Sequence, residues 1–282
     1  MTKNNNINFK KILKEIESKG FVIIENYFEN RYCVKLKNQI LSLKNELIKN
    51  QFFKDESSSK GQFILRDLVL RNPKVFLEVI SNSLILKIIG LIFKDKFIFD
   101  EIMASDSLKV KDNYSRTVHI DSQLPVQGID FTTDIVVMIC LDNFTELNGA
   151  TKLWPGSHKS GIRIHHQPNK IKNKINKFKY LKAPTGSIAF ILGQTWHQVG
   201  KNKSNESRMS IFLHYKRWWM KPSTDYTKCG KKIFKLLNNK QKQLFGFNSI
   251  PPKFDFKKKT KKLYTLRKIS KVSKNYFKSL QY

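Results

Sequence analysis

The chain has 282 residues, 40% of them hydrophobic, which is enough for the core of one all-β barrel or sandwich with helical additions. Three widely spaced cysteines without a Cys-x-x-Cys pair indicate neither a disulfide framework nor a zinc cluster, and they favour a reducing cytoplasm. The formal net charge of +31 would suit a nucleic-acid or anionic-surface partner. Lys, however, occurs in every segment, and Arg, the usual base-reading residue, is scarce. We therefore attribute the charge to AT-rich codon usage.

The first residues show no targeting pattern. Residues 1–8 are polar and Asn-rich, without the apolar segment of a signal peptide. The longest apolar runs, such as residues 135–141, are far shorter than the ~20 residues that span a bilayer. We therefore expect a soluble cytoplasmic protein with no transmembrane segment and no specific nucleic-acid partner.

The first hundred residues are predicted to be mostly helical. Apolar residues recur at helical spacing in three segments, at 9–19, 36–47 and 74–93. Gly20 ends the first pattern, and the apolar, β-branched run Phe21–Ile24 that follows predicts a strand. A polar loop is predicted at 54–62. Residues 1–96 are thus expected to form a helical region, with an early strand, that packs on the core.

From residue 97 the pattern changes to short apolar strands. Four are predicted, at 97–99, 135–141, 187–192 and 210–215. The Asn148–Gly149 and Pro155–Gly156 dipeptides predict tight turns between strands. We therefore place a β core at residues 97–222 and expect a fold that is mainly β with flanking helices.

The C-terminal part, residues 223–282, is predicted to be a basic extension. Residues 229–247 have the apolar spacing of a helix, and residues 253–282 contain eleven Lys or Arg and one Asp. An electrostatic arm for nucleic acid or anionic lipid would have this composition. No clean amphipathic face emerges, however, and we interpret the segment as a solvated or weakly docked tail.

Two histidines and one aspartate form a candidate metal centre. His119 and Asp121 are two positions apart, and such residues point to the same face of a β-strand. His197 ends a strand predicted at 188–197, so a folded barrel must bring it to the other two. Two histidines and one carboxylate are the ligand set of non-haem Fe(II) centres that activate O2. Three protein ligands leave three positions on an octahedral iron, two for a bidentate 2-oxo acid and one for O2.

Arg208 and Ser210 form a candidate carboxylate clamp. After His197 the chain passes through the turn-forming residues 200–205, and we expect it to return as an antiparallel hairpin that brings Arg208 to the level of His197. Arg208 and Ser210 share a face, and a guanidinium with a hydroxyl suits the distal carboxylate of a 2-oxo acid. An H-x-D match alone arises easily by chance, so a surface turn for the first pair and a core histidine for His197 are alternatives at this point.

The sequence between these residues is more specific. Residues 141–159 read LDNFTELNGATKLWPGSHK, and residues 184–215 read PTGSIAFILGQTWHQVGKNKSNESRMSIFLHY. The sequence resembles the phytanoyl-CoA dioxygenase family of Fe(II)- and 2-oxoglutarate-dependent oxygenases. The shared features are the H-x-D pair, the L-D, N-G-x-T, P-G-S-H and W-H motifs, and the arginine eleven residues after the histidine. The resemblance covers about residues 20–222 and is strongest from 117 to 217.

The resemblance implies a fold and roles for individual residues. The fold is a double-stranded β-helix, or jelly roll, with flanking helices. The implied iron ligands are His119, Asp121 and His197. The implied anchor of the 2-oxoglutarate carboxylate is Arg208. Ser210 is a helper candidate on geometry, and Thr151 is a weaker candidate for the same pocket.

The implied reaction is hydroxylation of an unactivated C–H bond in a small-molecule substrate, with O2 and 2-oxoglutarate consumed and succinate and CO2 released. In halogenating relatives a small residue replaces the carboxylate, so Asp121 favours hydroxylation. One alternative is a nucleic-acid demethylase of the AlkB type, which uses the same ligand pattern, and another is a non-catalytic basic binding module on a degenerate barrel. The N-G-A-T and P-G-S-H segments disfavour the first, and the intact four-residue set disfavours the second. The motifs define neither the substrate nor the oligomeric state.

The remaining histidines are expected to have structural roles. His158 lies in the Pro-Gly-Ser-His segment and is interpreted as a turn residue. His165 and His166 belong to a basic loop and are expected to be exposed. His214 falls in an apolar strand, and we expect a hydrogen-bonded core histidine.

Overall fold

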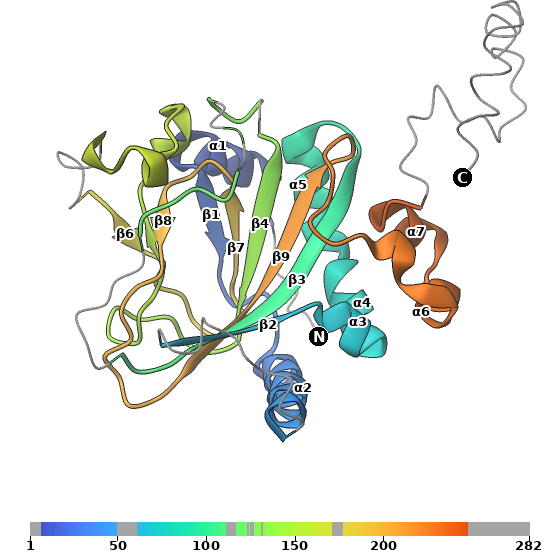
Figure 1. The fold of residues 1–282 in the computed structure, drawn as a ribbon. Coiled ribbons are helices and arrows are strands. Elements are labelled where there is room, and N and C mark those ends of the chain that lie inside the picture. The colour runs from blue at the N-terminus through green and yellow to red at the C-terminus, as the bar shows by residue number, and fades with distance from the viewer. Residues whose placement is uncertain are drawn as a thin grey trace, which may run out of the picture.

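The structure of the protein is a computed structural model that describes residues 7–49, 61–110, 117–122, 124, 127–130, 132–170 and 177–247. Its centre is a pair of antiparallel sheets (Figure 1). The larger sheet consists, in spatial order, of β1 (Phe21–Ile24), β7 (Ile188–Leu192), β4 (Asp134–Cys140), β9 (Arg208–Arg217), β3 (Phe97–Ser107) and β2 (Gln62–Arg66). The smaller sheet consists of β6 (Lys179–Tyr180), β5 (Lys152–Leu153) and β8 (His197–Gln198).

The two sheets pack against each other through an apolar cluster. Met138 of β4, Ala189 of β7 and Leu153 of β5 are fully buried in it. Alternate residues of a strand point to opposite faces. In β9, Ser210 lies opposite Cys140, which belongs to this cluster, so the strand register turns Ser210 and Arg208 toward the smaller sheet.

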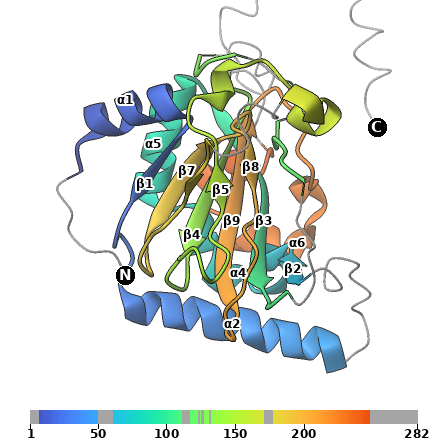
Figure 2. The same cartoon turned by 90° about the vertical axis from the view of Figure 1, so that its left-hand side faces the viewer.

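Helices cover the outer face of the larger sheet (Figure 1). They are α1 (Phe9–Lys19), α3 (Leu68–Arg71), α4 (Pro73–Ile80) and α5 (Ser83–Phe93), and α2 (Asn30–Lys49) lies at one end of the sheet. The largest apolar cluster joins them to the sheet, with Ile85 of α5 and Leu213 of β9 both fully buried. Figure 2 shows α2 running across one end of the larger sheet. Gly20 ends α1 with φ +87°, a left-handed conformation that glycine adopts without steric strain.

Two further helices, α6 (Gly230–Leu236) and α7 (Asn239–Leu244), follow the sheets. They replace the single helix expected at 229–247, because Asn238 starts α7 with a capping box. Phe245 stacks on Phe99 of β3, with 5.8 Å between the ring centroids, and so attaches this segment to the outer face of the larger sheet. The basic segment 253–282 lies outside the described residues.

The N-terminal region differs from the prediction in two ways. The helical pattern at 74–93 is two helices, because the side chain of Asn82 accepts a hydrogen bond from the Ile85 N–H group and starts α5 there. The strand β2 was not expected, and with β1 it supplies two strands of the larger sheet from this region. Most of the polar loop predicted at 54–62 lies outside the described residues.

No single helix in the described part of the chain has the length and apolarity of a membrane span. Helices α4 and α5 meet that standard only when taken together, and the pair is bent by 43°. Their apolar side chains, such as Phe76 and Ile88, are buried in the core that they share with the larger sheet.

Candidate functional site

The structure brings His119, Asp121 and His197 together beside the smaller sheet. One ligand atom from each residue lies within 4.8 Å of the others. Nε2 of His119 is 3.8 Å from Oδ1 of Asp121, and Nε2 of His197 is 3.5 Å from Oδ2 of the same carboxylate. A cation between them would meet two imidazoles and one carboxylate, the ligand set of non-haem Fe(II) centres.

Backbone hydrogen bonds between short segments hold this triad. His119 and His197 form an isolated antiparallel bridge, in which each N–H group donates to the carbonyl of the other residue at 3.0 and 2.9 Å. The single strand expected at 188–197 is wrong. β7 ends at Leu192 in the larger sheet, and after a turn His197 begins β8 in the smaller one. The turn is required because His197 must leave the sheet of β7 to face His119.

Both imidazole rings are oriented for a metal ion. Nδ1 of His119 lies 3.0 Å from the carbonyl oxygen of Thr117, and Nδ1 of His197 lies 3.0 Å from that of Thr195. A carbonyl oxygen only accepts hydrogen bonds, so each Nδ1 carries a proton, and in its neutral form each ring has its lone pair on Nε2. Contacts of this kind orient metal-binding histidines. The donor set and the ring orientation therefore both fit a divalent metal ion.

Burial and charge act differently on the three groups. Burial lowers the pKa of His119 to about 4, with a further contribution from His197, so this ring is neutral at pH 7. Burial also opposes a charge on His197, but the Asp121 carboxylate outweighs it and raises the pKa of His197. Burial would raise the pKa of Asp121, and the nearby His197 lowers it instead. A cation that displaces the proton of His197 would take over its pairing with Asp121.

Arg208 and Ser210 are a buried cation and a buried hydroxyl on the inner face of the larger sheet. The two residues are 2% and 1% exposed. Nε of Arg208 donates a hydrogen bond to the carbonyl of Asn148 at 3.2 Å, and its guanidinium carbon lies 4.1 Å from the ring centroid of Phe144. Oγ of Ser210 is buried without a hydrogen-bond partner among the described residues. Burial lowers the pKa of Arg208 to about 10, which leaves the guanidinium charged at neutral pH.

The carboxylates that influence Arg208 are paired with other cations. Asp106 forms an ion pair with Lys44 at 2.7 Å, and Asp142 forms one with Lys37 at 2.6 Å. A buried cation is unfavourable unless it is paired, and a buried hydroxyl is unfavourable unless it is hydrogen-bonded. Arg208 with the adjacent free hydroxyl therefore forms a site that suits an anion such as a carboxylate.

Arg208 reaches the site by a different route from the predicted hairpin. β8 pairs with β5 in the smaller sheet, whereas β9 begins at Arg208, opposite Ser107 of β3 in the larger sheet. Residues 199–207 thus cross from one sheet to the other, as a chain does at the corner of a two-sheet barrel. Thr151 is buried directly before β5, and within the described part of the chain no hydrogen bond joins it to Arg208 or Ser210.

A second group of potential ligands consists of Asp100, Glu101 and His214. Asp100 forms an ion pair with Lys216 at 2.9 Å, and Glu101 forms one with Arg66 at 2.8 Å. Both carboxylates are already neutralised by basic side chains, in contrast to the triad carboxylate, which faces two histidines. This group is therefore a weaker candidate for a metal ion.

The other histidines are placed as follows. His214 is half-buried rather than in the core, because its position in β9 turns it to the inner face that also carries Arg208. His158 is fully buried, and its Nε2 lies 2.9 Å from a backbone carbonyl of α1, which gives it a structural role. His166 is exposed as predicted, but His165 is half-buried and close enough to His119 to help lower its pKa.

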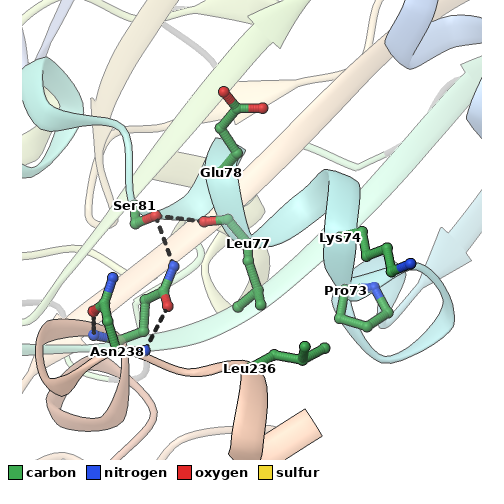
Figure 3. Close-up of a pocket in the computed structure, with 8 residues that line it drawn as sticks. Pro73, Lys74, Leu77, Glu78, Ser81, Leu236 and Asn238 are labelled. Atoms are coloured by element: carbon green, nitrogen blue, oxygen red, sulfur yellow. Dashed lines mark hydrogen bonds between the residues drawn. The ribbon is translucent and has the colours of Figure 1, made fainter.

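A groove of about 490 Å³ lies between α4 and the α6–α7 segment (Figure 3). Its lining includes Pro73, Lys74, Leu77, Glu78, Leu236 and Asn238. None of the predicted site residues is among the eight residues that line it, so this groove is separate from the candidate site.

Phe144 and Asn148 are neighbours of Arg208 that the sequence did not identify. Both lie within the motif-rich segment 141–159, but neither was assigned a role. They act through a ring face and a backbone carbonyl, respectively. Neither kind of contact has a signature in residue types, so only the fold reveals it.

Comparison with known sequences identifies a family. The model of the family described as phytanoyl-CoA dioxygenase (PhyH) matches residues 16–210. The uncharacterized protein Rv1501 of Mycobacterium tuberculosis is 19% identical over 251 residues, which cover 87% of this chain and 89% of that protein. Dioxygenase af480 of Aspergillus fumigatus is 30% identical over 140 residues, 48% of this chain and 44% of its own length.

Comparison with solved structures identifies the fold. HygX from Streptomyces hygroscopicus with nickel and 2-oxoglutarate bound has a TM-score of 0.60 and 13% sequence identity, and the match covers 75% of this chain and 88% of HygX. HygX with iron bound gives a TM-score of 0.59 at 13% identity, over 75% of this chain and 87% of that one. The likeness confirms the predicted fold class, a mainly antiparallel double-stranded β-helix with flanking helices.

Proposed function

The chain belongs to the phytanoyl-CoA dioxygenase family and is a 2-oxoglutarate-dependent dioxygenase, and we propose that it hydroxylates an unactivated C–H bond of a small molecule. The reaction consumes O2 and 2-oxoglutarate and releases succinate and CO2. The observation that carries the proposal is the convergence of the His119, Asp121 and His197 ligand atoms within 4.8 Å of one another. Structures of HygX with iron, and with nickel and 2-oxoglutarate, support the same cofactors here.

In this proposal His119, Asp121 and His197 are the Fe(II) ligands. Bound Fe(II) supplies the redox chemistry that activates O2. His119, Asp121 and His197 would hold the ion, which would bind 2-oxoglutarate and O2 as its remaining ligands. The side chains of His119 and Asp121 are 35% and 27% exposed, so the ion is reached from solvent on their side.

Arg208 is the proposed anchor for the distal carboxylate of 2-oxoglutarate. Its Nε donates to the Asn148 carbonyl and its guanidinium lies over the Phe144 ring. The two Nη groups are therefore left to bind a carboxylate in a bidentate manner. The hydroxyl of Ser210 is the proposed second donor, because it is buried and has no partner in the described part of the protein. Thr151 stays a weaker candidate for the same pocket.

The carboxylate of Asp121 supports hydroxylation over halogenation, since it fills the coordination position that halogenating relatives leave open. The match to the phytanoyl-CoA dioxygenase model over residues 16–210 supports a small-molecule substrate over the nucleic-acid substrates of AlkB-type demethylases. A cytoplasmic location stays a prediction.

The proposed substrate surface is the part of the inner face of the larger sheet beyond Arg208 and Ser210. Met103 of β3 and Phe212 of β9 lie opposite each other there and are half-buried. They share this face with Arg208 because they lie an even number of residues from Ser107 and Arg208 in their own strands. An apolar floor of this kind suits the hydrocarbon part of a substrate that carries an unactivated C–H bond.

Succinate release tests the proposal. The protein, purified anaerobically, is supplied with Fe(II), 2-oxoglutarate and O2, with and without a metabolite extract. We expect succinate to form above the level given by Asp121→Ala and His197→Ala, and the extract to gain a product heavier by one oxygen atom. His166→Ala is the matched control, because that histidine is exposed and outside the site. Equal succinate from the unmodified protein and the two ligand variants would refute the oxygenase function.

A further inference from the structure

Asp134 is a buried acid close to the candidate metal centre. It is the first residue of β4 and is 4% exposed. One carboxyl oxygen, Oδ2, lies 2.8 Å from Oγ1 of Thr133, whereas Oδ1 is buried with no hydrogen-bond partner among the residues that the structure describes. A buried carboxylate is unfavourable without full hydrogen bonding.

A series of contacts between side-chain oxygens, here called the hydroxyl chain, connects Asp134 to the segment that carries Asp121. Oγ1 of Thr133 lies 2.9 Å from Oγ of Ser122, the residue directly after Asp121. Oγ of Ser122 in turn donates to the carbonyl of Leu124 at 2.8 Å. The contacts thus run from the acid through two hydroxyls to a backbone acceptor.

The number of hydrogen atoms in the hydroxyl chain indicates the protonation state of Asp134. Each hydroxyl has one hydrogen to donate. If Asp134 is a carboxylate, Thr133 donates to it and Ser122 donates to Leu124, which leaves the 2.9 Å contact between the two hydroxyls without a hydrogen. If Asp134 is a neutral acid, it donates to Thr133, Thr133 donates to Ser122, and Ser122 donates to Leu124. Only the neutral acid therefore supplies a hydrogen to every contact.

A second connection runs through the backbone of Gly193. The N–H groups of Asp121 and Ser122 both donate to the Gly193 carbonyl at 2.9 Å, and the Gly193 N–H donates to the carbonyl of Asp134 at 3.0 Å. Gly193 also begins the turn that leads from β7 to His197. A Cβ at this glycine would lie 1.4 Å from Oδ1 of Asp134, so the carboxyl group packs directly against the glycine backbone.

We propose that Asp134, as a neutral acid, is a positioning residue that fixes Asp121 relative to His197 through the Thr133–Ser122 hydroxyls and the Gly193 backbone. The proposal rests on the function proposed above, because it treats the triad as the metal site. Burial raises the pKa of Asp134, and this rise, to which the negative charge of Asp121 adds, exceeds the lowering by the Thr133 and Ser122 hydroxyls, which agrees with the neutral form. Asp134 itself touches no reacting group.

The positioning role of Asp134 is tested by the affinity of the metal-free protein for Co(II). The affinity is measured by absorbance titration well below the melting temperature. Asp134→Ala and Thr133→Val both break the hydroxyl chain, and we expect each to weaken Co(II) binding about 10- to 100-fold, as loss of groups that orient metal ligands does. Asp134→Asn retains a donor toward Thr133, so its affinity is expected to stay close to that of the unmodified protein. Gly193→Ala displaces the Asp134 carboxyl group and is expected to weaken binding as Asp134→Ala does.

Asp106→Ala is the matched control for general destabilisation. Asp106 is also a buried acid of the larger sheet, 3% exposed, but it pairs with Lys44. Its loss is expected to lower the melting temperature of the metal-free protein without changing the Co(II) affinity. If Asp134→Ala and Thr133→Val behave like Asp106→Ala, or if Asp134→Asn is as weak as Asp134→Ala, the proposal is wrong.

The same titration separates this proposal from the proposed function. If the unmodified protein and Asp121→Ala bind Co(II) equally, the triad is not the metal site and both proposals fall. If Asp121→Ala abolishes binding while Asp134→Ala, Thr133→Val and Gly193→Ala leave it unchanged, the metal centre stands and only the role of Asp134 is refuted.

Discussion

The two halves of the candidate site are built in different ways. The metal half takes His119 from an isolated bridge, Asp121 from a bend and His197 from a strand of two residues. The anion half takes Arg208 and Ser210 from a ten-residue strand, in which Ser210 is paired with a neighbouring strand on each side. The triad side chains are between 13% and 35% exposed, whereas Arg208 and Ser210 are almost fully buried.

This difference shows that the two halves of the site are held in place by different kinds of contact. Strand register fixes the direction of Arg208 and Ser210, so the anion half needs no ligand to be organised. The triad depends on a few backbone hydrogen bonds and on contacts from outside, such as those of Gly193 and Ser122. We therefore expect substitutions in the metal half to change metal affinity, and substitutions in the anion half to change the KM for 2-oxoglutarate alone.

The largest effect is expected from His197→Ala. The variant lacks one of three metal ligands and the partner of Asp121, so succinate formation should fall on the order of a thousandfold, since a catalytic metal supplies several kcal/mol. Succinate release under saturating 2-oxoglutarate measures the effect, with His166→Ala as the control. Activity within tenfold of the unmodified protein would show that His197 is not a ligand.

Arg208→Gln is expected to raise the KM for 2-oxoglutarate about 10- to 100-fold, because a charge-assisted hydrogen bond contributes roughly 1.5–3 kcal/mol. The affinity for Co(II) should be unchanged, whereas substitutions in the metal half are expected to weaken it. Arg31→Gln serves as the control, since the Arg31 side chain is 83% exposed. A variant with weaker Co(II) binding and an unchanged KM would reverse the assignment of the two halves.

Ser210→Ala should have a smaller effect on the same constant. A neutral hydrogen bond contributes roughly 0.5–1.5 kcal/mol, so the KM for 2-oxoglutarate is expected to rise about two- to tenfold. The melting temperature should hold or rise, because the buried hydroxyl of Ser210 has no partner among the described residues. A large loss of stability with no change in KM would mean that Ser210 supports the fold and not the ligand.

The smallest effect is the pH dependence of stability at Asp134. Because burial raises its pKa in the folded state, the native protein keeps a proton that the unfolded chain has lost. The free energy of unfolding therefore falls as pH rises from the ordinary pKa of Asp to the raised one. Asp134→Asn lacks this titration, so its stability relative to the unmodified metal-free protein should increase over that window and then level off.

Denaturant unfolding at a series of pH values measures this difference. Asp121 and His214, whose charges also act on Asp134, are present in both proteins, so their contributions to the difference largely cancel. A difference that is constant with pH would indicate that Asp134 is charged in the folded state, which would also contradict its proposed role.

Much of the site was predictable from sequence because its chemistry lies in residue types and short spacings. His119 and Asp121 are two positions apart, His197 follows Trp196, and Arg208 shares the alternation of β9 with Ser210. The helices were also recognisable, since long amphipathic patterns such as that of α2 extend over several turns.

The path between these residues was not predictable in the same way. β5, β6 and β8 have two residues each, too few for any periodicity, so the crossing of His197 from one sheet to the other left no pattern. The contacts of Thr133 with Ser122 and of Asp134 with Gly193 join three separate segments, and only the folded chain brings them together. Residue types and spacing were enough to propose the ligand and anchor residues, and the folded structure was needed to propose the residues that position them.

The most direct test of the two-half site is a crystal structure of the protein grown anaerobically with Fe(II) and 2-oxoglutarate, with anomalous data collected at the iron edge. We predict one strong anomalous peak, bonded to Nε2 of His119, Nε2 of His197 and the carboxylate of Asp121 at ~2.0–2.2 Å, lengths typical of such ligands. The distal carboxylate of 2-oxoglutarate should contact Arg208. A peak at the Asp100, Glu101 and His214 group instead, or 2-oxoglutarate bound away from Arg208, would contradict this account.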